Sequence, residues 1–392
     1  MRRQHAIKLK YVANIFNGNS IPDSEKEKYV KKSIPYIPTK EISLNDGSIN
    51  YNNGLSVNED DGFRIAPPMS VLMCIEGGSA GRKIGFTDRP VAFVNKLCCF
   101  HGSKISKKFL YYALLSKDFT DQFFLNMTGL IGGVTTSTLK NLKVTVPVNI
   151  EEQHRIATYL DTKTSQIDAL ITNVHQQIEK LKAYKQSLIT QVVTKGLNPA
   201  VAMKDSGVEW IGEIPEGWGV VQTKYCATIN HGTDPKTEGN IPVYGSGAGS
   251  FKTCGEFKEG PAVLVGRKGA TLHIPHYIEG KYWNVDTAFD VVTNSRYHIK
   301  FYYYAATSFD YKRYMSQTTL PGMTQTAYRN MYLPYPDKEE QHHIAIYLDT
   351  KCSQIDQLLA LKQAKITKLE QYKKSLIYEY VTGKKEVPHG YQ

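Results

Sequence analysis

The sequence lacks the patterns that mark most metal sites, redox centres and membrane spans. Its six cysteines form no C-x-x-C pair, so they indicate neither a zinc site nor a redox motif, and such sparse use is typical of a reducing compartment. No run approaches the roughly eighteen apolar residues of a membrane-spanning helix, and no apolar run follows Met1-Arg2-Arg3. We therefore expect a cytoplasmic protein with no metal, no signal peptide and no membrane span.

Catalytic signatures are missing as well. The chain has no G-x-x-x-x-G-K-[ST] loop for ATP and no N-P-P-[FY] tetrapeptide of the kind used in adenine methylation. His154 and the His342-His343 pair stand at expected helix starts without the H-E-x-x-H spacing of zinc enzymes, which favours packing or interface roles. The glycine-rich stretch 245–249 is followed by no helix start, which favours a loop over a dinucleotide site. We expect no catalytic residue and no cofactor bound by this chain.

What the chain has is an excess of positive charge. Lys and Arg number 48 against 37 Asp and Glu, giving a formal net charge of +11. Such an excess fits a polyanionic partner, nucleic acid first, although a merely basic globular protein would show it too. With 392 residues the chain is also too long for one ordinary core, which indicates two or more domains.

A close internal repeat dominates the rest of the sequence. Residues 151–168 read EEQHRIATYLDTKTSQID, and residues 339–356 read EEQHHIAIYLDTKCSQID. The second copy begins at 339 where the first begins at 151, a spacing of 188 residues. Repeats of this kind identify duplicated structural units, so both copies should form the same element.

Both copies carry the start and stop signals of long helices. Asn149 and Asp337 can each cap a helix N-terminus, since their side chains accept hydrogen bonds from free backbone N–H groups. Gly196 and Gly383 stand where each helix would end, because glycine readily takes the left-handed conformation that closes a helix. The sequence therefore predicts helices over 151–195 and 339–383.

Apolar residues recur along both helices by alternating steps of three and four. Lys185 and Lys373 interrupt the same heptad position in the two copies. A sustained seam predicts a coiled coil, whereas two amphipathic helices in separate cores are the alternative. Because the termini of a domain often lie close together, we expect the helices to run antiparallel. The seam residues are Ile167, Ile171, Val174, Ile178, Leu181, Leu188, Val192, Ile355, Leu359, Ile366, Leu369, Leu376 and Tyr380.

The two segments outside the helices are related but divergent. Lys10–Ile15 matches Lys224–Ile229, and Phe109–Ala113 matches Phe301–Ala305. The helices stay nearly constant while these segments differ. A duplicated scaffold that carries two divergent domains suits a target with two unlike parts.

Local patterns in both segments indicate α+β domains with mixed sheets. Short apolar runs bounded by Gly, Pro and Asn are typical of strands, and the Phe- and Tyr-rich segments 107–125 and 299–315 are typical of helices. The first domain is longer, and we expect its extra residues around Asp23–Lys32 and Asn45–Gly54. The fold class is therefore two globular α+β domains separated by two long helices that form an antiparallel coiled coil.

Together these features resemble the specificity subunits of Type I restriction–modification systems. The most specific signature is P-x-x-x-E-E-Q-H-R-I-A-x-Y-L-D at 147–161, which recurs from Pro336 with one residue fewer after the proline. The tract Ser206–Trp218 is similar to that family's start of a target-recognition domain, a start that the first domain lacks. The resemblance implies target-recognition domains at 1–150 and 217–338, spacer helices at 151–195 and 339–383, a linker at 196–216 and a tail at 384–392.

The family resemblance also implies a role and partners. The subunit would be non-catalytic and would bind double-stranded DNA, two modification (adenine-methyltransferase) subunits and restriction (motor–nuclease) subunits. S-adenosylmethionine, ATP and magnesium would be bound by those partners. The residues expected at the subunit interface are Gln153, His154, Tyr159, Asp161, Gln341, His342, Tyr347 and Asp349.

Three sets of polar, glycine-rich loops recur in both domains and are expected to read DNA. One set matches Gly81-Arg82-Lys83 with Gly266-Arg267-Lys268, whose cations suit phosphate or guanine. Gln325 suits adenine, and the loop threonines suit phosphate or a thymine methyl. Solvated loop charges and turn structure are the alternatives. The expected DNA-binding residues are Asn17, Gly18, Asn19, Arg82, Lys83, Gly133, Thr135, Thr136, His231, Thr233, Arg267, Lys268, Gly322, Thr324, Gln325 and Thr326.

The expected target is two short unlike half-sites around an unread spacer, contacted in successive major grooves, with one methylated adenine in each half-site. The aromatic runs 111–112 and 302–304 could stack on bases, but their helical spacing favours the domain core. Three other functions remain open: an enzyme with an unfamiliar site, a coiled-coil adaptor that does not read DNA, and a specificity subunit of another phage-defence or methylation-only system.

Overall fold

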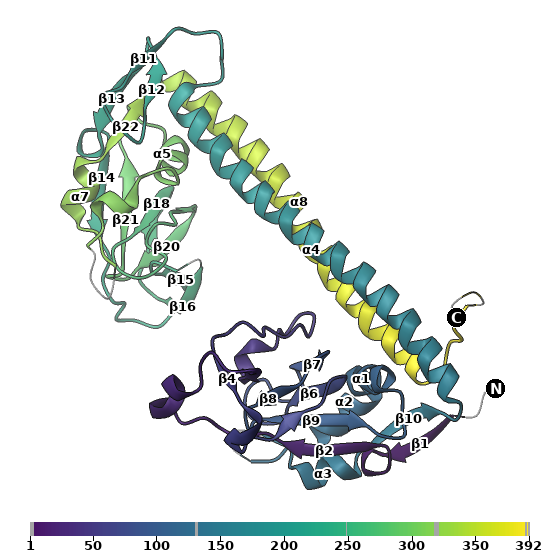
Figure 1. Cartoon of the computed structure of the whole chain (residues 1–392). Helices are drawn as coiled ribbons and strands as arrows, with labels where there is room; N and C mark the ends of the chain where they lie inside the picture. The colour runs from purple at the N-terminus through teal and green to yellow at the C-terminus, as the bar shows by residue number, and fades with distance from the viewer. Residues whose placement is uncertain (1–3, 130–131, 248, 317–320, 389, 391–392) are drawn as a thin grey trace. The chain divides into compact units, whose positions relative to one another are not determined.

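The computed structural model describes residues 4–129, 132–247, 249–316, 321–388 and 390 (Figure 1). Met1–Arg3, Ala248 of the glycine-rich stretch and parts of the expected tail lie outside these residues. Internal contacts divide the chain into unit 1, residues 1–175 with 364–392, and unit 2, residues 176–363. Each unit contains one β-sheet domain and about half of each long helix, α4 (Ile150–Lys195) and α8 (Lys338–Val381).

The domain of unit 1 is built from three sheets. The first has the order β2-β9-β6-β7 and is antiparallel throughout; the second has the order β4-β3-β8-β5, with β3 and β8 parallel; and β1 pairs with β10. The strands are β1 (Gln4–Lys8), β2 (Ala13–Asn17), β3 (Ile34–Ile37), β4 (Ser56–Val57), β5 (Ile65–Ala66), β6 (Ser70–Cys74), β7 (Ile84–Thr87), β8 (Val91–Phe93), β9 (Leu97–Gly102) and β10 (Lys143–Pro147).

The domain of unit 2 repeats this plan strand for strand. Its sheets have the orders β14-β21-β18-β19, β16-β15-β20-β17, with β15 and β20 parallel, and β13-β22. A further pair, β11-β12, precedes them. The strands are β11 (Met203–Asp205), β12 (Glu213–Pro215), β13 (Gly219–Gln222), β14 (Ala227–His231), β15 (Ile241–Tyr244), β16 (Ser250–Cys254), β17 (Lys258–Glu259), β18 (Ala262–Gly266), β19 (His276–Ile278), β20 (Lys281–Asn284), β21 (Ala288–Thr293) and β22 (Tyr332–Tyr335). The mixed α+β domains predicted from sequence are confirmed.

Short helices also correspond between the domains. The α-helices are α1 (Lys107–Leu115), α2 (Lys117–Leu125) and α3 (Thr136–Asn141) in unit 1, and α5 (Ile299–Ala306), α6 (Tyr311–Tyr314) and α7 (Gln325–Asn330) in unit 2. The 3-10 helices are η1 (Leu9–Tyr11), η2 (Asp23–Lys28), η3 (Thr39–Glu41), η4 (Glu59–Asp61) and η5 (Thr223–Tyr225). η2 and η3 lie between β2 and β4, where the extra residues of the first domain were predicted.

Both long helices begin at the predicted cap residues and α4 ends beside Gly196, whereas α8 ends at Val381, two residues before Gly383. Asn149 Oδ1 accepts a hydrogen bond from the N–H of Glu151 (2.9 Å), and Asp337 Oδ1 accepts one from the N–H of Glu340 (2.8 Å). Gly196 follows the last residue of α4 with φ of 74°, a conformation that favours glycine. Local chemistry therefore sets where both helices begin and where α4 ends.

The two long helices pack antiparallel. In unit 1, Tyr159 of α4 contacts Tyr380 of α8, with ring centroids 4.6 Å apart. In unit 2, Gln177 of α4 accepts a hydrogen bond from Lys362 of α8 (2.5 Å). As the residue number on α4 increases from 159 to 177, the number of the contacting residue on α8 decreases from 380 to 362. The predicted antiparallel pair is therefore confirmed (Figure 1).

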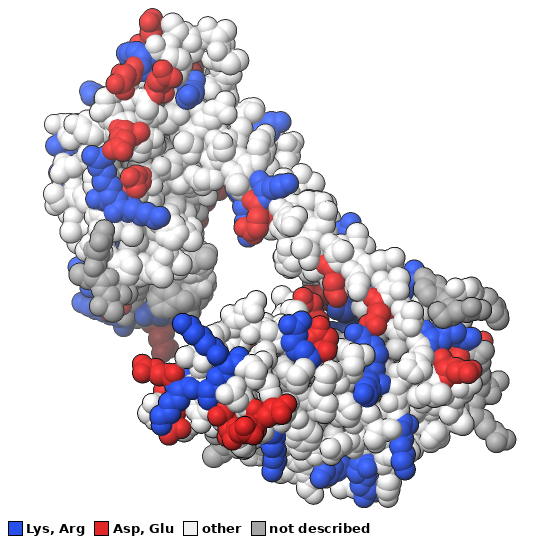
Figure 2. All heavy atoms as spheres, viewed as in Figure 1, with Lys and Arg blue, Asp and Glu red and all other residues white. Residues whose placement is uncertain are grey.

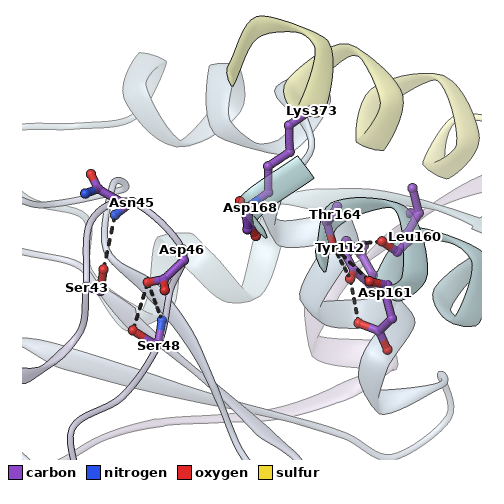
Figure 3. A network of polar contacts seen from close by, with 10 residues as sticks. All are labelled: Ser43, Asn45, Asp46, Ser48, Tyr112, Leu160, Asp161, Thr164, Asp168 and Lys373. Carbon is purple, nitrogen blue, oxygen red and sulfur yellow. Dashed lines mark hydrogen bonds and ion pairs between the residues drawn. The ribbon is translucent and has the colours of Figure 1, made fainter. Parts of the chain in front are cut away.

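The two lysines that interrupt the apolar seam each form an ion pair with the other long helix. In unit 1, Lys373 Nζ lies 2.7 Å from both carboxylate oxygens of Asp168 (Figure 3). In unit 2, Lys185 Nζ lies 2.7 Å from both carboxylate oxygens of Asp356. The repeat relates Lys185 to Lys373 and Asp168 to Asp356, so the helices make the same ion pair twice.

Each domain shares one core with the helix ends beside it. In unit 1, Leu160 of α4 and Ile377 of α8 are buried with Phe100 and Phe109 of the domain. In unit 2, Val193 of α4 and Leu348 of α8 belong to a core with Phe289 and Phe301, which Ile211, Ile214 and Trp218 also enter. Part of the expected linker is therefore packed structure; the domain boundaries themselves stay a prediction.

All six cysteines are free and buried. Burial raises the pKa of the Cys99 and Cys226 thiols to about 12, so neither forms a thiolate at neutral pH. Within the described residues, none of the helices combines the length and the apolar character needed to cross a membrane.

Candidate nucleic-acid interface

In each unit, the predicted loop before the short helix α3 or α7 contacts the residues that directly follow β6 or β18. In unit 1, the N–H of Val134 donates to the carbonyl of Ile75 (2.9 Å), and Glu76 forms a β-bridge with Gly133. In unit 2, the N–H of Met323 donates to the carbonyl of Arg267 (2.9 Å), and Lys268 bridges Gly322. The loops after β6 and β18 are therefore fixed by backbone contacts to the loops before α3 and α7.

The first loop set joins the same surface through the helix starts. The Thr136 hydroxyl donates to Asn17 Oδ1 at the end of β2. Gln325, at the equivalent position of α7, donates through Nε2 to the carbonyl of Ile229 in β14 (2.6 Å). Both side chains are thus already engaged within the domain, so base reading by Gln325 would require this bond to open.

Packing explains the glycines of the first loop. A Cβ on Gly18 would lie 1.9 Å from the carbonyl oxygen of Phe93, and one on Gly232 would lie 2.1 Å from that of Val285. No side chain fits in that space, so glycine is required in both domains. Next to Gly18, Asn19 Oδ1 accepts a hydrogen bond from the N–H of Arg64 (2.9 Å). These two glycines shape the loop and offer no side chain to DNA.

The predicted threonines also have local partners. Thr135 and Thr324 are the N-cap residues of α3 and α7, and their hydroxyls accept hydrogen bonds from Thr138 and Ala327 N–H groups (3.2 and 3.1 Å). This is the turn role that was the alternative to DNA contact. Thr326 is exposed on the first turn of α7.

In unit 2, His231 is the last residue of β14 and Thr233 lies in the loop that follows, and both residues are exposed. The His231 ring lies edge-on to Phe289, with centroids 4.9 Å apart. The carbonyl of Thr233 accepts a hydrogen bond from Trp283 Nε1 (2.7 Å), and its N–H donates to the carbonyl of Asn284 (3.0 Å). The loop is therefore held by its backbone while its side chains face outward.

The predicted match between the two Gly-Arg-Lys tripeptides is wrong. Strand pairing aligns Val71 of β6 with Val263 of β18, because each stands opposite equivalent residues of β9 and β21. Counting on from there, Arg267 and Lys268 correspond to Ile75 and Glu76. Arg82 and Lys83 instead precede β7, whose counterpart is β19. The sequence comparison aligned the two tripeptides because their residues are identical. The strand registers show that the two tripeptides occupy different positions in the two domains.

The four predicted cations differ in how free they are. Lys83 Nζ donates to the carbonyl of Thr39 (3.1 Å), and the Arg267 guanidinium donates to the carbonyl of Asp286 (3.1 Å). Arg82 and Lys268 are exposed. Glu76, which sequence reasoning missed, is exposed at the position of Lys268. Its place directly after the apolar run 71–75 was the signal that could have identified it.

The repeated glutamines are used inside the chain. Gln153 Oε1 accepts a hydrogen bond from the N–H of Ser106 (2.8 Å), and its Nε2 donates to the carbonyl of Pro147 (2.9 Å). Gln341 makes the same two bonds with His298 and Pro336 (2.7 and 2.9 Å). Both side chains are buried. Their assignment to a subunit interface stays a prediction that these contacts do not support.

The repeated aspartates anchor a tyrosine of the domain. Asp161 accepts a hydrogen bond from the hydroxyl of Tyr112 (2.6 Å; Figure 3), and Asp349 accepts one from Tyr304 (2.7 Å). Burial, followed by the bond to its aspartate, raises the pKa of each tyrosine far above its usual value. The hydroxyls therefore stay protonated and hold each domain on its helix.

Other members of the expected subunit interface reach the surface. His154 and Asp161 line an open groove of about 540 Å³ in unit 1, together with Lys108 and Met69. His342 is exposed, and Tyr347 is partly buried against the core of unit 2. Tyr159, by contrast, is buried against Tyr380.

The aromatic runs lie in the domain cores. Tyr112, Tyr302 and Tyr304 are buried, as the domain-core interpretation requires. Among the residues that the structure describes, no group of three His, Cys, Asp or Glu side chains is placed to hold a metal ion.

Comparison with known proteins finds one matching family and relatives of similar sequence. Residues 5–180 and 215–371 match the family described as Type I restriction modification DNA specificity domain. The Type I restriction enzyme MjaVIII specificity subunit of Methanocaldococcus jannaschii is 25% identical over 92% of this chain and 87% of its own length. The putative MjaX specificity subunit of the same organism is 36% identical over 27% of this chain and 24% of its own length.

Solved structures share the fold. A chain from work on complex assembly and conformational transition of the type I R-M system has a TM-score of 0.75 at 14% identity, covering 97% of this chain and 98% of that one. The HsdS subunit from Thermoanaerobacter tengcongensis has a TM-score of 0.51 at 16% identity, with 97% of each chain covered.

Proposed function

The chain belongs to the family of Type I restriction–modification DNA-specificity subunits, and from its place there as the non-catalytic subunit that recognises the DNA target we propose that its two domains read two unlike half-sites. Each domain would present its loops to a major groove, and the bases between the half-sites would go unread. The target would then be bipartite and asymmetric.

One observation carries this proposal: the two domains share a backbone frame but present opposite charges at the same exposed position. Glu76 bridges Gly133 in unit 1, and Lys268 bridges Gly322 in unit 2. A carboxylate can accept a hydrogen bond from cytosine N4, whereas an ammonium can donate to guanine O6 and N7. The same loop would therefore select different bases in the two domains.

The proposal extends to the partners. Two adenine-methyltransferase subunits would dock on this subunit, one for each half-site, and motor–nuclease subunits would join them. The repeated helix starts support this stoichiometry, because His154 and His342 occupy equivalent exposed positions in the two units. S-adenosylmethionine, ATP and magnesium would be bound by those partners, and the complex would act in the cytoplasm.

Methylome sequencing of cells that express this chain with its methyltransferase tests the proposal. The expected motif has two short unlike half-sites around a spacer of unspecified bases, with one modified adenine in each. A continuous palindrome, or a motif with a single half-site, would contradict the reading by two domains.

Two matched variants assign the half-sites. We expect Glu76→Ala to relax the motif at one position of one half-site and Lys268→Ala to relax one position of the other, each by about 1–3 kcal/mol of discrimination. Each variant is the control for the other, because both should leave the opposite half-site unchanged. Relaxation of the same half-site by both variants would exclude the pairing of these residues with separate domains.

A further inference from the structure

Several residues that the two domains retain have a structural role that explains their presence in both. Gly18 and Gly232 avoid a clash with a backbone carbonyl, and Thr135 and Thr324 cap equivalent short helices. Retention of such residues carries no information about a ligand. A residue that is retained and exposed but has no packing role needs another explanation. Contact with a ligand that both domains share would explain why it is present in both.

The pairs Lys10-Tyr11 and Lys224-Tyr225 are retained and exposed, and the hydrogen bond that Lys224 Nζ donates to Asn330 Oδ1 (3.4 Å) joins two exposed residues of the same surface. Tyr11 is 58% exposed and Tyr225 is 64% exposed. Each lysine ammonium lies over the ring of its neighbour, 5.2 Å from the centroid in unit 1 and 5.1 Å in unit 2. The two domains thus hold the same exposed arrangement of cation and ring on η1 and η5, although the loops beside them have diverged.

A second retained pair completes the patch. The backbone N–H of Leu9 donates to the carbonyl of Leu142 (3.0 Å), and that of Thr223 donates to the carbonyl of Met331 (2.9 Å). These bonds fix η1 and η5 beside the C-terminal ends of α3 and α7. There the exposed residues are Lys140 and Asn141 in unit 1, and Arg329 and Asn330 in unit 2.

Each domain therefore carries a patch of two cations, one tyrosine and one asparagine. The unit 1 patch comprises Lys10, Tyr11, Lys140 and Asn141; the unit 2 patch comprises Lys224, Tyr225, Arg329 and Asn330. Within the described residues, none of these four cations takes part in an ion pair. Figure 2 shows Lys and Arg side chains along the edge of unit 1 where β1, β2 and α3 lie.

We propose that these two patches bind the phosphodiester backbone of duplex DNA, one beside each half-site, without regard to base sequence. Phosphate is the chemistry common to any two half-sites, so the residues that bind it can stay the same while the reading loops change. Lys, Arg, Tyr and Asn are side chains that donate to phosphate oxygens. The patches lie at the other end of α3 and α7 from the loops that read bases. The inference rests on the proposed function, since it assigns a second role on the same two domains.

The test uses the complex of this chain with its methyltransferase subunits and measures duplex binding against salt between about 50 and 200 mM. The patch variant K10A/K140A/K224A/R329A is compared with wild type on the methylome-defined target and on a scrambled duplex. The slope of log K against log salt should fall by about 0.9 for each phosphate that the variant no longer neutralises. Binding to both duplexes should weaken by the same factor, and the methylated motif should not change.

Two controls keep the result specific. K180A/K365A/K368A/K374A removes four exposed charges from α4 and α8 and should leave the slope close to that of wild type. K10R/K140R/K224R/R329K keeps the charges and should restore it. An unchanged slope in the patch variant, a weakening confined to the target duplex, or release of the methyltransferase without a change in slope would each overturn the proposal. A wild-type complex that binds both duplexes equally would instead refute the reading of half-sites.

Discussion

At the scale of single residues, equivalent positions in the sheets hold charged and polar side chains in unit 2 but apolar side chains in unit 1. In unit 2, the buried Asp290 accepts hydrogen bonds from Lys258 Nζ (2.5 Å), Asn230 Nδ2 (3.1 Å) and the Tyr282 hydroxyl (3.4 Å). Strand pairing places Cys99, Ala66, Phe16 and Val91 at the equivalent positions of unit 1, which belong to an apolar cluster or pack against it. One frame thus accommodates either an ion pair or hydrocarbon.

Removing one partner of this ion pair should lower the stability of unit 2 much more than removing both charges. Asp290→Ala leaves the ammonium of Lys258, one quarter exposed, without its anion, and we expect a loss of about 3 kcal/mol. The double variant Lys258→Met, Asp290→Asn keeps the volumes and removes both charges, so it should lose less. All three tryptophans, Trp210, Trp218 and Trp283, lie in unit 2, so urea unfolding followed by tryptophan fluorescence isolates this unit. A double variant as unstable as the single one would refute the argument.

At the scale of elements, α1 and α5 begin differently although they occupy equivalent places. Ser106 caps α1 by accepting a hydrogen bond from the N–H of Phe109, whereas the cap residue of α5, His298, makes no such bond. His298 lies beside His342, with Nε2 and Nδ1 3.4 Å apart. Burial first, and then the nearby His342, lower the pKa of His298. Unit 2 therefore favours the neutral imidazole.

The lowered pKa of His298 predicts a loss of stability in mild acid. The unfolded chain binds a proton at this residue more readily than the folded one, so unit 2 should weaken as pH falls through about 6.5, the ordinary histidine value. His298→Ser copies Ser106 and supplies the missing cap, which should add about 1 kcal/mol. Fluorescence-monitored urea titrations at neutral and mildly acidic pH should show a smaller fall in the variant. An equal fall in both proteins would remove His298 as the cause.

Elements were more predictable from the sequence than the site was. Helix ends follow local chemistry, so Asn149 and Gly196 could be identified as start and stop signals without knowledge of the fold. The extra residues of the first domain were located correctly because loops tolerate insertions. The equivalence of Glu76 and Lys268 was not predictable in the same way, since strand pairing over long sequence distances sets it. For the same reason, no local pattern showed that Gln153 would bond to Ser106.

At the scale of the whole molecule, the charge pattern of the duplicated helices favours one direction of pairing. In the antiparallel arrangement Lys185 meets Asp356, and Lys373 meets Asp168. A parallel pairing of the two copies in register would place lysine beside lysine and aspartate beside aspartate. The lysines that interrupt the apolar seam therefore stabilise the observed direction and oppose the other one.

Charge reversal tests this selection. Asp168→Lys with Asp356→Lys puts like charges at both positions and should destabilise the helix pair by about 0.2–1 kcal/mol per pair, since these side chains are partly exposed. Adding Lys185→Asp and Lys373→Asp restores opposite charges and should recover the stability. Thermal unfolding followed by circular dichroism, at low and high salt, measures both steps. A fourfold variant no more stable than the double one would show that the pairs contribute nothing.

The buried cysteines have a practical consequence for experiments on the intact subunit. Because the thiolate is the nucleophile, thiols such as Cys99 and Cys226, with pKa values near 12, should resist maleimide dyes in the folded protein at neutral pH. The folded wild-type protein should therefore give little background labelling with thiol-reactive dyes. A cysteine introduced in each domain would accept one fluorophore apiece, and energy transfer between them would follow the separation of the two domains as DNA binds.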